Sequence, residues 1–100
     1  MSSAKKPANN FANALRVARK LQGVSQENFS LVSSRTYVSS IERGVRVPTL
    51  NKVDELASVL GVHPLTLLFL AYAPDLSPGS IEKLQSLISI EIMSLGDVGS

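Results

Sequence analysis

The stretch SQENFSLVSSRTYVSSIERG, residues 25–44, constrains the fold of this chain more than any other segment. Ser25 suits a helix N-cap, because its hydroxyl can accept a hydrogen bond from an unpaired amide of the first turn. Ser34 can cap a second helix over residues 35–43, and Gly44 can end that helix in a left-handed conformation. The stretch therefore predicts two short helices joined by a tight turn.

The second of these helices divides into two faces when its residues are placed at ~100° intervals. The face predicted to be buried carries Val38, Ile41 and Glu42. The opposite face is polar and is bordered by Arg35 and Tyr37; it carries Thr36, Ser39, Ser40 and Arg43. Such a face can lie against a groove of duplex DNA, where Arg reads guanine edges and a hydroxyl reads a base or a phosphate. The alternative is an ordinary solvated helix face.

Glu42 needs a partner, because an unpaired carboxylate on a buried face would be costly. The same placement over residues 11–22 puts Phe11, Leu15, Ala18 and Gln22 on one face, with Arg19 at its edge. We therefore predict a partly buried ion pair between Arg19 and Glu42 that fixes how the two helices pack.

Composition indicates one globular domain. The chain has 100 residues, of which 44% are hydrophobic and 18% charged, so it is too apolar to be disordered. It contains no cysteine, which excludes a disulfide framework and a thiolate metal site and fits a cytoplasmic protein. The first ten residues are polar and do not predict a signal peptide. The most apolar run, LTLLFLA, is far shorter than the ~20 residues that span a bilayer, so no membrane association is expected.

The net charge of +2 conceals an asymmetry between the two halves of the chain. Residues 1–50 contain eight Lys or Arg and two acidic residues, whereas residues 51–100 contain two Lys and six acidic residues. A basic half and an acidic half indicate one face directed at nucleic acid. Chance segregation is the alternative, and the clustering of basic residues around residues 25–44 disfavours it.

The chain divides into three parts. Residues 1–9 are predicted to be a flexible tail, in which Lys5 and Lys6 lie. Residues 10–73 are predicted to form the main domain, with further helices over 10–21, 50–60 and 65–72. Residues 74–100 are predicted to be a linker and a last helix over 78–95, followed by a frayed end. The helix over 50–60 is expected to direct a core stripe inward: Leu50, Val53, Leu56, Ala57 and Leu60. Polar residues at the starts of these helices are candidate caps: Thr49, His63 and Ser77.

The last helix carries an apolar stripe that is wider than a small domain needs: Ile81, Leu84, Leu87, Ile88, Ile92 and Leu95, with Ile90 and Met93 in addition. We interpret the stripe as a dimerisation element whose contacts come from Ile81, Leu84, Ile88 and Ile92. Packing of this helix onto its own chain is the alternative that the sequence leaves open.

The segment from about Phe11 to Leu70 resembles the Cro/CI-type (XRE-like) helix-turn-helix domain of phage repressors and small bacterial regulators. The resemblance lies in the order and spacing of several short motifs: Leu15-Arg16 with Arg19-Lys20, Ser25-Gln26-Glu27, Arg35-Thr36-Tyr37-Val38-Ser39, Ile41-Glu42-Arg43-Gly44, Pro48-Thr49-Leu50, and Leu56-Ala57 with Leu60-Gly61-Val62. It implies an all-α fold, a compact five-helix lambda-repressor-like helix-turn-helix domain, to which the last helix adds an amphipathic C-terminal element.

The resemblance also implies roles for single residues. Arg35, Thr36 and Ser40 are expected to reach base edges, and Ser39 joins them on the polar face. Contacts with the DNA backbone are expected from Gln26, Arg43 and Arg46, and we add Tyr37 and Lys20. The family also pairs the positions of Arg19 and Glu42. The tract between Glu27 and Arg35 is shorter than is usual in the family and lacks the common Ala-Gly turn, so the first short helix must be shorter or the turn tighter.

These features predict a transcriptional regulator that binds double-stranded DNA sequence-specifically, as a homodimer, in the cytoplasm of a bacterium or in a phage-infected cell. No catalytic constellation is visible and His63 has no second ligand residue, so we expect neither an enzyme nor a cofactor or metal. Two alternatives stay open. One is an antitoxin or a restriction-modification controller, which also binds DNA and, as an antitoxin, a partner protein through the last helix. The other is a protein-interaction module without DNA binding.

Overall fold

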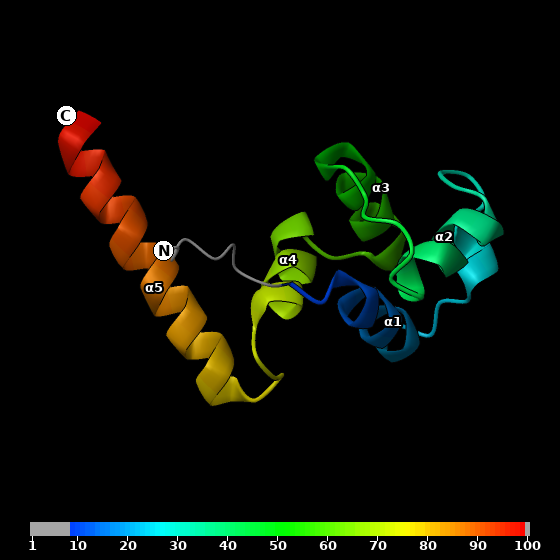
Figure 1. Ribbon diagram of the computed structural model, residues 1–100, viewed down its shortest axis with the longest axis horizontal. Helices are drawn as coiled ribbons and strands as arrows, with labels where there is room; N and C mark the ends of the chain where they lie inside the picture. The colour runs from blue at the N-terminus through cyan, green and yellow to red at the C-terminus, as the bar shows by residue number, and fades with distance from the viewer. Residues whose placement is uncertain (1–8, 100) are drawn as a thin grey trace.

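A computed structural model describes the backbone of residues 9–99 and the side chains of residues 9–96. The described chain is all-α (Figure 1), and its elements in order are α1 (Phe11–Leu21), the 3-10 helix η1 (Gln26–Phe29), α2 (Arg35–Glu42), α3 (Leu50–Leu60), α4 (Pro64–Tyr72) and α5 (Pro78–Gly99). The predicted fold class is confirmed. The predicted tail over residues 1–9 lies outside the described residues, apart from Asn9.

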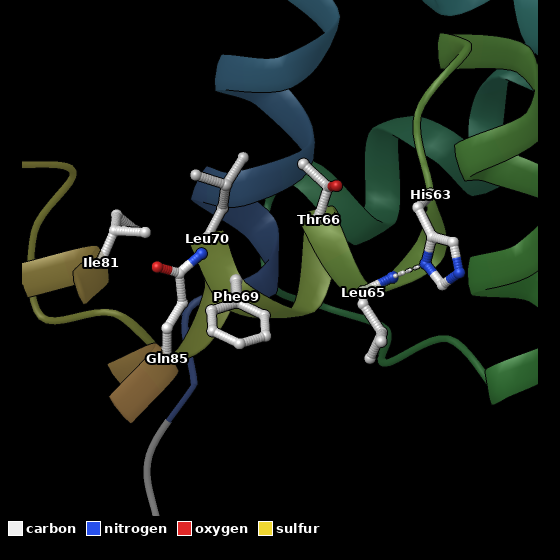
Figure 2. A pocket seen from close by; sticks show the side chains of 7 residues that line it. All are labelled: His63, Leu65, Thr66, Phe69, Leu70, Ile81 and Gln85. Carbon is white, nitrogen blue, oxygen red and sulfur yellow. Dashed lines mark hydrogen bonds between the residues drawn. The ribbon is translucent and has the colours of Figure 1, made fainter. Parts of the chain in front are cut away.

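The helices begin at the polar residues expected from the sequence. Amides of the first turn donate to the side chains of Ser34, Thr49, His63 and Ser77. The ring nitrogen Nδ1 of His63 accepts from the Leu65 amide at 3.0 Å (Figure 2), so this histidine is a helix cap. Gly44 and Gly61 follow α2 and α3 with φ angles of 76° and 73°, which residues with a Cβ rarely adopt.

One core joins α1 to α4. α1 packs against α2 and α4, and α3 packs against α4 and η1. The largest fully buried side chains come from all five of these elements: Leu15, Phe29, Val38, Ile41, Leu56 and Leu67. Burying one such side chain contributes about 1.5–3 kcal/mol. The shortest elements are therefore held by the same core as the longer helices.

The element before the turn is a 3-10 helix of four residues, not an α-helix. Phe29, its last residue, is fully buried, and the Phe29 carbonyl accepts from the amides of Val32 and Ser33 at 2.9 and 2.8 Å. These bonds close the turn immediately after the buried ring. A 3-10 helix suits a run this short, and the shortening that the tract before Arg35 predicted is present.

Two predictions about helix ends are wrong. Leu50, assigned to the core stripe, is 72% exposed. It is the first residue of α3, and the buried stripe begins one turn later at Val53. The last helix does not end near Leu95 but continues to Gly99. Gly96 within it costs about 1 kcal/mol relative to alanine but breaks no helical hydrogen bond.

α5 stands away from the other helices and packs mainly against α4 (Figure 1). It raises the radius of gyration to 15.2 Å, against about 13 Å for a compact chain of this length. The side of α5 that meets α4 carries half-buried Ile81, Leu84 and Ile88. Ile81 faces Leu70 across the joint between the two helices (Figure 2). Farther along, Ile92 and Leu95 are 61% and 73% exposed.

The predicted ion pair between α1 and α2 is present. Arg19 Nε donates to Glu42 Oε2 at 2.6 Å, and Arg19 Nη2 donates to Glu42 Oε1 at 2.9 Å. The pair is bidentate, and only 15% of the Arg19 side chain and 6% of the Glu42 side chain are exposed. It fixes the C-terminal end of α2 against the last turn of α1.

Further hydrogen bonds extend this pair to neighbouring segments. Gln26 Nε2 in η1 donates to Glu42 Oε1 at 3.1 Å, and Arg19 Nη1 donates to the Val24 carbonyl at 3.2 Å. Arg16 Nη1 donates to the Glu42 main-chain carbonyl at 2.9 Å, which satisfies one of the free carbonyls at the end of α2. One carboxylate thus ties together α1, η1 and α2.

The environment of Glu42 favours its charged form. Burial by itself would raise the pKa of Glu42. Hydrogen bonds from Arg19 and Gln26, together with the attraction of the Arg19 and Arg16 charges, outweigh burial and hold the pKa below the ordinary value of 4.5. The hydrogen bond with Glu42 in turn raises the pKa of Arg19, against the lowering effect of burial.

Replacing Arg19 by alanine should lower the free energy of unfolding by roughly 3 kcal/mol, because it leaves a buried carboxylate without its charge partner. Urea denaturation of wild type and Arg19→Ala measures this difference. Lys20→Ala is the matched control: it removes the neighbouring, exposed cation and should change the unfolding free energy by less than about 0.5 kcal/mol. Equal stabilities of wild type and Arg19→Ala would refute a structural role for the pair.

The free energy of unfolding should also fall in acid, because Glu42 becomes protonated. The folded-state pKa of Glu42 is lowered. Its contribution to the free energy of unfolding is therefore fully present above pH 4.5 and is lost as the pH falls through the folded-state pKa. Glu42→Gln keeps the shape but cannot be charged, so wild type should be the more stable of the two near neutral pH and the difference should shrink in acid. Denaturation of both proteins between roughly pH 7 and pH 3 tests this; a difference that stays constant with pH would contradict it.

Candidate nucleic-acid interface

The exposed side of α2 carries most of the residues predicted to contact DNA. Arg35 and Thr36, in its first turn, are exposed. Ser39, one turn later, is half-buried, and Arg43, which caps the C-terminal end, is exposed. The structure thus brings these four side chains together along one helix. Arginine and short hydroxyl side chains in this arrangement can donate to base edges and to phosphates.

Ser40 does not belong to this surface, and its predicted place on the exposed face of the helix is wrong. It is 6% exposed, and its hydroxyl donates to the Tyr37 carbonyl at 2.6 Å. The chain after Gly44 folds back over it, because the amides of Val45 and Arg46 donate to the Ser40 carbonyl at 2.9 and 3.3 Å. A helical wheel treats one helix in isolation, so it cannot show that a loop from elsewhere in the chain covers one face of that helix.

Arg35 is held by an acidic residue of η1. Its Nη1 lies 2.9 Å from Glu27 Oε1, and both side chains are largely exposed, at 67% and 70%. The two elements that form the helix-turn-helix are therefore joined by an ion pair at the protein surface. Exposed pairs of this kind contribute about 0–1 kcal/mol, so the contact can be exchanged for another.

Tyr37 positions cations from two other segments. The Arg46 guanidinium lies 5.8 Å from the centroid of the tyrosine ring, and Lys52 Nζ of α3 lies 5.6 Å from it. Tyr37 is half-buried, and Arg46 is exposed in the loop after α2. The ring therefore holds a loop arginine near the end of α2, beside the face that carries Thr36 and Ser39.

Two other predicted backbone contacts lie at the ends of elements. Gln26 opens η1 and is half-buried; one donor of its amide group is engaged by Glu42, which leaves its second donor free for a phosphate. Lys20 is exposed in the last turn of α1 and makes no ion pair within residues 9–96. Lys20 is thus the one predicted contact that no interaction links to the α2 surface.

Sequence reasoning missed three residues that arrange this surface. Arg16 caps the end of α2, Glu27 pairs with Arg35, and Lys52 Nζ donates to the Val32 carbonyl at 2.6 Å while pairing with Glu55 at 2.7 Å. Arg16 lies one turn before Arg19, and the free carbonyls of a helix end need donors, so a signal for it existed. The role of Lys52 depends on the path of the turn and had no signal in the sequence.

The interface offers hydrogen-bond donors and positive charge, not a site for metal chemistry. Among the described residues, no group of three or more His, Cys, Asp or Glu side chains is placed to hold a metal ion. An open hollow of about 370 Å³ lies where η1 meets the start of α2, lined by Arg19, Ser25, Gln26, Glu27 and Arg35.

Within the described part of the chain, no single helix has the length and apolar character needed to cross a membrane.

The chain is similar to a helix-turn-helix family and to two proteins of known structure. Residues 15–67 match the helix-turn-helix family model. The crystal structure of the restriction-modification controller protein C.AhdI from Aeromonas hydrophila is similar, with 36% identity and a TM-score of 0.54, over 57% of this chain and 89% of that one. The crystal structure of the hypothetical transcription factor NHTF from Neisseria is similar as well, with 33% identity and a TM-score of 0.57, over 74% of this chain and 79% of that one.

A comparison with curated protein sequences gave no match. The family model nevertheless covers more than half of the chain, and it spans α1 to α4 with the exposed α2 at its centre. The chain belongs to the XRE-like helix-turn-helix family and is a DNA-binding transcriptional regulator.

Proposed function

We propose that the protein is a cytoplasmic repressor that binds a two-fold symmetric operator as a homodimer. The observation that carries the proposal is the exposed first half of α2, where Arg35 and Thr36 protrude next to Ser39. A helix presented in this way fits the major groove, where base pairs differ in their pattern of donors and acceptors.

In this proposal the base contacts come from Arg35, Thr36 and Ser39. Backbone contacts from several elements set the register of α2 on the duplex: Gln26, Arg43, Arg46 and Lys20. Tyr37 contributes by holding Arg46 toward the duplex through its ring. Phosphate contacts of this number make affinity strongly dependent on salt.

The dimer contact is proposed to be α5. The apolar stripe that meets α4 through Ile81, Leu84 and Ile88 continues beyond α4, where Ile92 is 61% exposed. A groove of about 500 Å³ between α4 and α5 lies beside it, lined by Glu91 and otherwise by apolar and aromatic side chains of both helices. In a two-fold dimer, the free half of one α5 would cover the groove of the partner, which gives a self-complementary contact. An antitoxin, by contrast, would place a different protein on this helix.

A second candidate function is control of restriction-modification genes. It is favoured by the similarity to the restriction-modification controller protein C.AhdI, of which 89% is covered at 36% identity. Selection of bound fragments from the host genome would distinguish the two. Recovery of sites upstream of a methyltransferase or endonuclease gene would support the controller, and recovery of unrelated promoters alone would reject it.

The experiment that tests the main proposal is binding of the purified protein to DNA from upstream of its own gene. A scrambled duplex serves as the control, both are measured at two salt concentrations, and the mass of the complex is recorded. Saturable, preferential binding with two chains per site is the expected result. Equal, salt-sensitive binding to both duplexes would locate the operator elsewhere, and one chain per site would reject the dimer.

Arg35→Ala should weaken binding to the operator by ~1–3 kcal/mol and relax preference at one base position, because it removes a guanidinium that can pair with a guanine edge. Competition with operators substituted at single positions measures the effect. Arg43→Ala is the comparison, since loss of a backbone contact should weaken all sequences alike. A uniform loss for Arg35→Ala would make Arg35 a phosphate contact instead.

Ile92→Glu should shift the protein from dimer to monomer without unfolding it, because Ile92 is exposed within one chain and buried only in the proposed dimer. Analytical ultracentrifugation measures the mass, and circular dichroism checks the fold. Ser94→Glu adds the same charge on another side of α5 and should leave the dimer intact. A wild-type monomer, or equal behaviour of both variants, would exclude this stripe as the contact.

A further inference from the structure

The ion pair between Glu27 and Arg35 is the starting point. Arg35 Nη1 lies 2.9 Å from Glu27 Oε1, across the turn that separates η1 from α2. The Glu27 carboxylate makes no other hydrogen bond or ion pair within residues 9–96, whereas the nearby Glu42 carboxylate accepts from three donor atoms, two of Arg19 and one of Gln26. Glu27 is therefore committed to Arg35 alone, on the surface directed at DNA.

Stability does not account for this pair. Both side chains are about two-thirds exposed, and pairs of that kind contribute little to folding. The start of α2 is already capped, because Ser34 Oγ accepts from the Tyr37 amide at 3.1 Å. Phe29 holds η1 in the core. The pair can therefore open at little expense to the fold.

Its position matters more for binding. Arg35 is the first residue of α2, where the helix dipole attracts anions. The Glu27 carboxylate supplies an anion in the place where a DNA phosphate would approach. If Arg35 exchanged this carboxylate for a phosphate, one charge-assisted contact would replace another of similar kind. Glu27 would then be left without its partner, facing the negatively charged duplex. A bidentate guanine contact is different, because it favours the correct base by a factor of ~5–150.

We propose that Glu27 determines specificity by keeping Arg35 off phosphates of non-specific DNA. The pair stays closed on a duplex that offers Arg35 only a phosphate, and it opens where a base edge offers two hydrogen bonds. Glu27 is thus a positioning residue that acts through Arg35. The inference rests on the proposed role of Arg35 at the operator.

The test is a double-mutant cycle on a scrambled duplex, with wild type, Glu27→Gln, Arg35→Ala and the double variant. Binding is followed by fluorescence anisotropy over a series of salt concentrations. Glu27→Gln should bind the scrambled duplex ~2–5-fold more tightly, because breaking an exposed ion pair can reduce the affinity of wild type for DNA by about that factor. It should also steepen the slope of log affinity against log salt by ~0.9, because one more phosphate is neutralised. Both changes should be absent when Arg35 is alanine.

Glu82→Gln makes the same change of charge on α5 and should alter neither quantity. An unchanged salt slope in Glu27→Gln overturns the inference. So does tighter binding that persists in the double variant, since the carboxylate would then act only by its own repulsion of DNA. Failure of the proposed function appears separately, as a wild-type protein that does not prefer the upstream duplex over the scrambled one.

Discussion

The bidentate contact between Arg19 and Glu42 is the interaction on which the DNA-directed part of the molecule depends. α2 has eight residues and η1 has four, so neither can be stable as an isolated helix. The Glu42 carboxylate accepts from Arg19 and Gln26, and the Glu42 carbonyl accepts from Arg16. These bonds fix the end of α2 on α1 and η1 on α2. The orientation of the exposed first turn follows from this anchored last turn.

Much of this could be predicted from the sequence because it depends on local rules. Helix caps such as Ser34 and Thr49 act within one turn of their own position, so their residue types suffice to locate them. The ion pair was predictable for a different reason. An acidic residue on an otherwise apolar face must find a cation, and Arg19 stood at the edge of the facing helix. The apolar stripe of α5 was also visible in the sequence.

The errors arise where a distant segment decides the outcome. Ser40 lies on the polar side of its helix but is covered by the returning chain at Val45 and Arg46. Leu50 has the spacing of a core residue but lies beyond the core. The contact of Lys52 with the Val32 carbonyl requires the three-dimensional path of the turn. Among the interface residues, Arg35 and Thr36 were placed correctly on the surface, whereas the pairing of Arg35 with Glu27 was not foreseen.

The attachment of α5 has a consequence for how such a protein can diverge. The proposed base contacts lie in α2, whereas α5 joins the domain through residues 73–77 and its contact with α4. If two chains meet through the exposed half of α5, one residue inserted between Ile88 and Ile92 would leave the contact with α4 intact, turn the domain by ~100° and move it by about 1.5 Å along the helix axis. The core and the recognition surface would be untouched. The spacing between two half-sites and the bases within each half-site can then evolve independently.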